Sequence, residues 1–171
     1  MQKTLKDFDS KDAIFIDANI FLHHAFDINP ISIEFLKKIE HFNLRVYTSA
    51  LVLEEITFKL LIQSASNFLS KVTVHGVKTL LKDDKKRKQM ITPVLGYMKY
   101  IEILKESGLV IIDIKGRDIL KAVQNARAYG LITADAAHLS VMERNGIHQI
   151  ATGDADFLTV SNIIVWSPVE K

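Results

Sequence analysis

Residues 13–26 read AIFIDANIFLHHAF, and the expected fold depends on this stretch. An apolar run leads into Asp17, and a helical pattern follows at once. An uninterrupted apolar run of this length, followed by a helical pattern, is typical of a buried parallel strand that feeds a crossover helix. The stretch therefore predicts an α/β sheet in which one strand ends at an acidic residue.

Acidic residues follow an apolar run at three further places. They are Glu55 in TSALVLEEI (48–56), Asp135 in ITADAAHLS (132–140) and Asp154 in IATGDADFL (150–158). Ligands of open parallel sheets bind outside the carboxyl ends of the strands. Four acids that lie far apart in the sequence are therefore expected to meet at one edge of the sheet.

A cluster of carboxylates is costly unless a cation lies between them. Two unit charges about 4 Å apart repel each other by roughly 4 kcal/mol at an effective dielectric constant of 20. Hard divalent cations prefer oxygen ligands, so the predicted cofactor is Mg²⁺ or Mn²⁺. Asp17, Asp135 and Asp154 are the candidate metal ligands. Glu55 is the candidate for orienting a water molecule or helping to hold a second ion.

Each acid also has a simpler structural explanation. Asp17 suits a helix N-cap, and Asp135 would interact favourably with the dipole of the helix that it begins. Glu55 could be a surface helix residue, and Asp154 part of an Asp-Gly turn. The occurrence of all four at strand–helix junctions is less easily accidental than any one of them.

Strands alternate with helices along most of the chain. We expect strands at 13–17, 44–48, 109–113, 147–152 and 163–166, and helices at 31–41, 51–62, 117–129 and 134–144. Two or three further helices are expected between residues 64 and 107. The pattern predicts a three-layer α/β sandwich with a mostly parallel sheet of about five strands and a helical extension. We expect residues 1–171 to form one domain, with a helical insertion at about 64–108.

The composition is that of an ordinary globular protein. The chain has 171 residues, a net charge of +2 and no cysteine, which excludes disulfides, a thiolate nucleophile and a zinc–sulfur site. No apolar run approaches the roughly 20 residues that a membrane-spanning helix needs. The N-terminal residues contain no signal segment, so a cytoplasmic location is expected.

The four acidic segments resemble those of PIN-domain nucleases, and most closely those of VapC-type toxins from prokaryotic toxin–antitoxin pairs. The matching segments occur in the order of the family: FIDANIFL (15–22), TSALVLEEI (48–56), ARAYGLITADAAHL (126–139) and IATGDADF (150–157). The third segment is the most specific. The resemblance implies a metal-dependent endoribonuclease that cleaves single-stranded or structured RNA, with Asp17, Glu55, Asp135 and Asp154 as its acidic cluster.

The resemblance also suggests residues that support the cluster. Ser49 and Thr152 match hydroxyl positions of the family, and Asn19 matches a polar neighbour of the first acid. We expect these side chains to fix the geometry of the carboxylates, as outer-shell groups do. Asp156 is a reserve ligand or a helix cap. His138 shares a helix face with Asp135, and we interpret it as a packing or supporting residue.

Hydrolysis of a phosphodiester needs a nucleophile, charge neutralisation and help for the leaving group. No Ser, Cys or His has the context of a nucleophile, so we expect in-line attack by water that leaves a 5′-phosphate and a 3′-hydroxyl. Candidates for RNA contacts are Arg127 and the basic residues of KDDKKRK (82–88), namely Lys85, Lys86, Arg87 and Lys88. A run of this kind is also common on a solvated helix face.

The sequence is compatible with more than one partner and more than one function. The apolar helix at 51–62 and the helices after it could form a homodimer interface or hold an antitoxin protein. Segment 64–107 is longer than in compact toxins of this type, so a PIN nuclease of RNA processing or a metal-free PIN-like binding module is an alternative. A phosphatase of the haloacid dehalogenase type would need a second acid at position 19, where this chain has Asn19. A receiver domain does not fit the contexts of Asp135 and Asp154.

Overall fold

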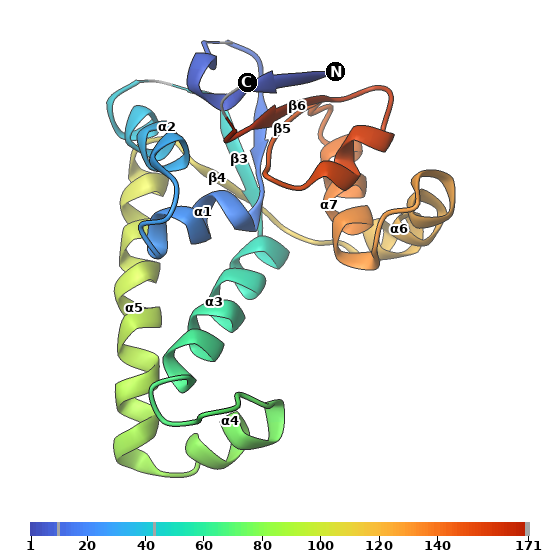
Figure 1. Ribbon diagram of the computed structural model, residues 1–171. Coiled ribbons are helices and arrows are strands. Elements are labelled where there is room, and N and C mark those ends of the chain that lie inside the picture. The colour runs from blue at the N-terminus through green and yellow to red at the C-terminus, as the bar shows by residue number, and fades with distance from the viewer. Residues whose placement is uncertain (10, 43, 170–171) are drawn as a thin grey trace.

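The structure is a computed structural model that describes residues 1–9, 11–42 and 44–169. Six parallel strands form one central sheet in the order β1-β6-β5-β2-β3-β4 (Figure 1). Their bounds are β1 Gln2–Thr4, β2 Ile14–Ile16, β3 Val46–Ser49, β4 Val110–Ile112, β5 Gln149–Ala151 and β6 Ile164–Ser167. The α/β class and the parallel sheet are confirmed.

The sheet of about five strands is also confirmed, with β1 as one additional strand at its edge that the sequence did not indicate. Its residues pair with β6, in a register that places Gln2 beside Val165 and Thr4 beside Ser167. An edge strand is bonded on one side only and needs no continuous apolar run. The sequence QKT (2–4) therefore carries no strand signal of the kind that marks β2.

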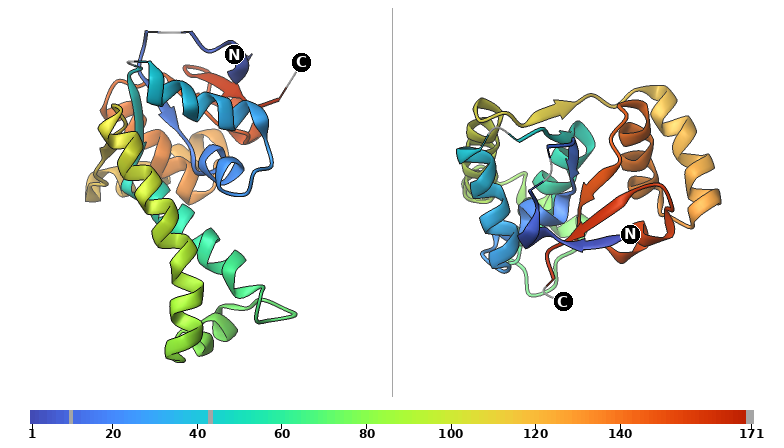
Figure 2. Two further views of the ribbon diagram at one scale, coloured as in Figure 1. Left: turned by 90° about the vertical axis from the view of Figure 1, so that its left-hand side faces the viewer. Right: turned by 90° about the horizontal axis from the view of Figure 1, so that it is seen from above.

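Helices cover both faces of the sheet, which gives the expected three layers (Figures 1 and 2). One face carries α1 (Ala18–Ala25), α2 (Pro30–His41) and α5 (Asp84–Glu106). The other carries α7 (Thr133–Arg144), and α6 (Gly116–Tyr129) packs on the outside of α7. Because α7 lies between the sheet and α6, eight consecutive residues from Asp135 to Met142 are buried.

The segment after β3 forms an arm that projects from the sheet (Figure 1). It consists of α3 (Ala50–Ala65), α4 (Val74–Leu80) and the first half of α5. A separate small apolar cluster of Ala65, Val77, Leu80 and Met90 holds the end of the arm together. Within the described part of the chain, no helix is long and apolar enough to cross a membrane.

The helix boundaries agree with the signals in the sequence. Asp17 caps α1, and the Ser49 hydroxyl caps α3 by accepting from Val52 N at 3.3 Å. Gly130 ends α6 with a φ of 73°, a left-handed conformation that costs glycine little. The caps of α1 and α3 fix the places where β2 and β3 pass into helices. Asp17 and Asp154 follow strands, whereas Glu55 lies inside α3 and Asp135 begins α7, which follows α6, so the expectation that all four acids lie at strand–helix junctions is wrong for these two.

Candidate active site

The four predicted acids line one cleft at the carboxyl edge of the sheet. Asp17 follows β2, Glu55 projects from α3, Asp135 lies in the first turn of α7 and Asp154 follows β5. The cleft has a volume of about 700 Å³ and includes all four side chains in its lining. The parallel topology thus brings together residues that are up to 137 positions apart, while their chemical roles remain predictions.

Asp17 is the most deeply placed of the four, with 5% of its surface exposed. Its Oδ1 accepts a hydrogen bond from Ala18 N at 2.6 Å, and its Oδ2 accepts one from Thr152 Oγ1 at 2.7 Å. Asn19 Nδ2 also donates to Oδ2. Burial raises the pKa of Asp17, although His138 and the hydrogen bonds from Thr152 and Ala18 act in the opposite direction. Asp17 is therefore both a helix cap and a member of the acidic cluster.

Thr152 connects the end of β5 to the start of α1. Its hydroxyl donates to Asp17 and accepts from Asn19 Nδ2 and Asp154 N, both at 2.9 Å. Asn19 Oδ1 in turn accepts from Gly153 N at 2.8 Å. These bonds fix the orientation of the Asp17 carboxylate, which is the kind of support that the sequence predicted for Thr152 and Asn19.

Glu55 is held between two basic side chains. Lys59 Nζ lies 2.5 Å from Glu55 Oε1, and His138 Nε2 lies 3.8 Å from Glu55 Oε2. His138 and Lys59 lower the pKa of Glu55 to about 2, so this carboxyl group is ionised near neutral pH. The sequence analysis overlooked Lys59, although its position four residues after Glu55 is the usual spacing of a helical ion pair.

Asp135 has the opposite environment. Burial, followed by the charges of Asp17 and Asp154, raises the pKa of Asp135 to about 6. Its Oδ2 is buried and, among the described residues, has no hydrogen-bond partner. A buried carboxylate oxygen without a donor, placed beside other acids, fits the oxygen donor set of a divalent cation.

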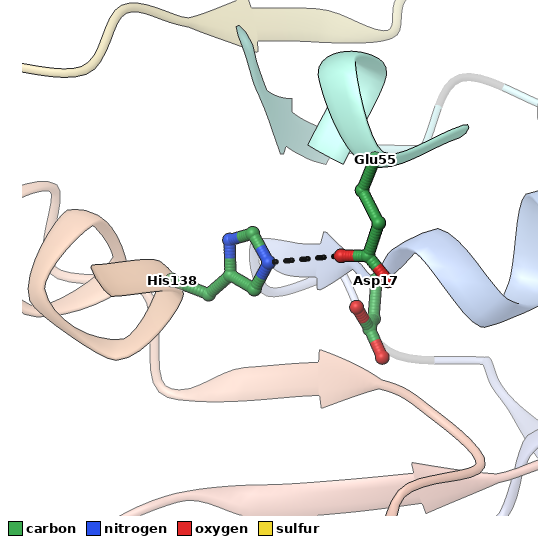
Figure 3. Close-up of side chains that lie close together, drawn as sticks. All are labelled: Asp17, Glu55 and His138. Carbon is green, nitrogen blue, oxygen red and sulfur yellow. Dashed lines mark ion pairs between the residues drawn. The ribbon is translucent and has the colours of Figure 1, made fainter. Parts of the chain in front are cut away.

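His138 is fully buried and faces the acids from α7 (Figure 3). One ligand atom each from Asp17, Glu55 and His138 lies within 4.8 Å of the others. Neither ring nitrogen of His138 has a hydrogen-bond partner in the described part of the chain. Its ring packs against Phe15, with centroids 5.7 Å apart, so the expected packing role is only part of what the structure shows.

The other candidate residues do not line the cleft. The described bond of the Ser49 hydroxyl caps α3, and the exposed Asp156 donates its backbone N–H to Asp154 Oδ1. Arg127 is exposed on α6. Lys85, Lys86, Arg87 and Lys88 are exposed at the start of α5, near the end of the arm (Figure 1).

His23 of α1 also lines the cleft. Its Nδ1 lies 2.9 Å from Ser32 Oγ, within hydrogen-bonding distance. Burial lowers the pKa of His23, and the charge of Asp17 acts against that shift. His23 is thus a second imidazole near the acids, although it stands outside the group formed by Asp17, Glu55 and His138.

The raised pKa of Asp135 makes this side chain a source of instability when no cation is present. We expect Asp135→Asn to raise the free energy of unfolding by about 1 kcal/mol in EDTA at about pH 7.5, after allowance for solvent screening. The folded-state pKa of about 6 exceeds the unfolded value, so ionisation at Asp135 costs stability as the pH rises through about 6. Below about pH 4 the carboxyl is protonated in both states and the gain should vanish.

Urea denaturation at the two pH values measures this effect. Asp113→Asn is the matched control, because Asp113 is an exposed acid that follows β4 and does not line the cleft. If Asp135→Asn is less stable than the unmodified protein in EDTA at about pH 7.5, the ionised Asp135 carboxylate does not destabilise the folded state.

The chain is similar to known proteins both in its sequence profile and in its fold. The sequence profile of the PIN domain matches residues 14–163. No curated protein sequence matches the chain. The fold is similar to that of VapBC2 from Rickettsia felis bound to a promoter DNA fragment, with 16% identity, a TM-score of 0.55, and 91% of this chain and 98% of the other covered.

Two further solved structures have the same fold at equally low identity. A toxin–antitoxin complex from Klebsiella pneumoniae has 17% identity and a TM-score of 0.53, over 92% of this chain and 99% of the other. The third structure is VapC20 of Mycobacterium tuberculosis, which is described as a toxin that cleaves the sarcin–ricin loop. It has 13% identity and a TM-score of 0.55, over 88% of this chain and 96% of the other. The profile match spans most of the chain and includes all four acids of the cleft, so the chain belongs to the PIN domain family.

Proposed function

We propose that this protein is a metal-dependent endoribonuclease that hydrolyses phosphodiester bonds of single-stranded or structured RNA. The observation that carries the proposal is the single cleft lined by Asp17, Glu55, Asp135 and Asp154. Within it, the Oδ2 of Asp135 is buried, has no hydrogen-bond partner among residues 1–9, 11–42 and 44–169, and is an oxygen suited to a cation. Membership of the PIN domain family supports the nuclease class.

The donor set of the cleft fits Mg²⁺ or Mn²⁺. A bound divalent cation supplies neutralisation of the phosphate charge and a lower pKa for the attacking water. Asp17, Asp135 and Asp154 are the proposed ligands, and Thr152 and Asn19 keep the Asp17 carboxylate in one orientation. Glu55 is ionised and can accept a hydrogen bond from the attacking water, which positions that water for in-line attack.

The proposed biological role is that of a toxin held by an antitoxin. The structures of similar fold include the VapBC2 complex of R. felis and the toxin–antitoxin complex of K. pneumoniae. We also propose a homodimer. Growth arrest on expression, relieved by a small protein encoded beside the gene, would favour the toxin over a nuclease of RNA processing.

The basic residues of the arm are a proposed contact for the RNA backbone. Lys85, Lys86 and Lys88 are exposed, whereas Arg87 is paired with Asp84 at 2.6 Å. Phosphate contacts of this kind make RNA affinity fall with salt. Unchanged affinity and salt dependence after alanine replacement of all four residues would remove the arm from the binding surface.

A cleavage assay tests the nuclease directly. The full chain with Mn²⁺ or Mg²⁺ is expected to cut a single-stranded RNA into fragments with 5′-phosphate ends, and EDTA should stop the reaction. The same preparation should release no phosphate from a small monoester. Phosphate release without RNA cleavage would support a phosphatase, and RNA binding without cleavage would support a binding module that has lost its metal.

A further inference from the structure

We propose that His138 is a nitrogen ligand of the metal site, shared with Asp17 and Glu55, and that this site binds Mn²⁺ in preference to Mg²⁺. The inference rests on the proposed metal-dependent function and deepens it. It adds a nitrogen donor to the oxygen ligands Asp17, Asp135 and Asp154 that are proposed above. It also gives Glu55 a direct place among the ligands.

The distances support shared coordination. Ligand atoms each about 2.1 Å from one ion lie between about 3 Å apart, at right angles, and about 4.2 Å apart, on opposite sides. His138 Nε2 and Glu55 Oε2 are 3.8 Å apart, within this interval, whereas an N–H···O hydrogen bond would need about 2.9 Å. The third donor, from Asp17, lies within 4.8 Å of both, a bound that extends about 0.6 Å beyond this interval, so a small side-chain movement would complete the coordination where the separation exceeds it (Figure 3).

The burial of His138 supplies the second argument. Its side chain has no exposed surface, and neither Nδ1 nor Nε2 has a hydrogen-bond partner among the described residues. Burying an imidazole in this state is costly, because both nitrogens lose their bonds to water. Coordination through Nε2 satisfies the nitrogen that faces Asp17 and Glu55.

The position of His138 in the fold holds its imidazole ring in place. It lies on α7 one turn after Asp135, and α7 is clamped between the sheet and α6. Phe15 of β2 packs against the ring and limits its movement. An imidazole fixed in this way is pre-positioned as a ligand and need not be ordered when the ion binds.

A nitrogen donor changes which ion the site prefers. Mg²⁺ is a hard cation that takes oxygen ligands and keeps several waters. Imidazole binds first-row transition ions with an affinity that rises from Mn²⁺, the weakest of them, towards Cu²⁺, so a nitrogen donor favours Mn²⁺ over Mg²⁺ without making Mn²⁺ the tightest-binding ion. Lys59 already neutralises part of the charge of Glu55 at 2.5 Å. Together with Asp135 and Asp154 of the same cleft, the donors are then carboxylates, one of them partly neutralised, and one imidazole, and it is the imidazole that favours Mn²⁺ over Mg²⁺.

Pulsed electron paramagnetic resonance of the full chain loaded with Mn²⁺ tests the inference without any substitution. The electron spin echo should be modulated by a ¹⁴N nucleus, and the modulation should change to the ¹⁵N pattern when the protein contains ¹⁵N-labelled histidine. Oxygen-only coordination gives no such histidine signal. Bound Mn²⁺ without a histidine nitrogen would overturn the inference.

Two variants assign the nitrogen to its residue. His138→Gln should lose the signal and weaken Mn²⁺ binding at least about tenfold, with less than about a threefold change for Mg²⁺, as measured by titration calorimetry. His23→Gln is the matched control, because His23 lines the same cleft and should leave the signal intact. Survival of the signal in His138→Gln, or its loss in His23→Gln, would refute the assignment.

The outcomes separate this inference from the proposed nuclease. If RNA cleavage requires Asp17 and a divalent ion but the resonance of bound Mn²⁺ contains no histidine nitrogen, the proposed nuclease is supported and His138 is not a ligand. Failure of both Mn²⁺ and Mg²⁺ to bind removes the metal site and the metal dependence of the nuclease together. Circular dichroism shows whether His138→Gln folds. If it does not fold, the ¹⁴N and ¹⁵N modulation of the unmodified protein still decides whether a histidine nitrogen binds the ion.

Discussion

Asp17→Asn is expected to reduce RNA cleavage at least about a thousandfold, equivalent to about 4 kcal/mol of transition-state stabilisation, while the chain stays folded. Asn retains an Oδ1 that can accept the hydrogen bond of Ala18 N, and asparagine is a favourable N-cap. What it loses is the negative charge at the most deeply buried acid of the cleft, together with the Oδ2 acceptor of the hydrogen bonds from Thr152 and Asn19. Single-turnover cleavage, with circular dichroism as the test of folding, measures the effect.

Asp113→Asn provides the matched control for this experiment. Asp113 is also an aspartate that follows a strand, β4, but it is exposed and does not line the cleft. Its substitution should leave the cleavage rate within about twofold of the unmodified protein, as expected for a surface position. Cleavage retained by folded Asp17→Asn would remove the central assignment of the active site.

The acids could be found from the sequence because their positions follow from topology. A buried parallel strand has a strong signal, and its carboxyl end is a fixed point in an α/β fold. Asp17 and Asp154 lie directly at such ends, and the structure places both at the cleft. Glu55 lies within α3, where the apolar spacing of the helix placed it beside the core side. Asp135 lies in the first turn of α7, where the sequence indicated its position in the helix but not the direction of its side chain.

The partners of these acids were harder to predict, since they depend on packing between elements. The pattern around His138 showed a residue on the same face as Asp135, but it gave no indication that Nε2 faces Glu55 from α7. The ion pair with Lys59 had a local signal, the spacing of four residues, which was overlooked. The edge strand β1 has neither an apolar run nor a local turn signal, so only the pairing with β6 reveals it.

The helix that carries Asp135 and His138 is anchored by an ion pair that the sequence analysis did not anticipate. Arg144, at the end of α7, donates from Nε to Asp118 Oδ1 at 2.8 Å and from Nη2 to Asp118 Oδ2 at 3.0 Å. Asp118 is 2% exposed and also accepts from Lys115 N at 2.8 Å, which closes the first turn of α6. This pair therefore joins α6 to α7 behind the candidate active site.

Arg144→Ala is expected to lower the free energy of unfolding by about 3 kcal/mol, because it leaves the buried Asp118 carboxylate without its cation. It also removes a donor at 2.7 Å from the carbonyl oxygen of Asp113. Arg87→Ala is the matched control: its partner Asp84 lies at 2.6 Å, but the two side chains are 44% and 81% exposed, so the loss should stay below about 1 kcal/mol. Urea denaturation of both variants measures the difference. Equal losses would show that burial does not strengthen the contact between Arg144 and Asp118, and that α7 keeps its place through apolar packing alone.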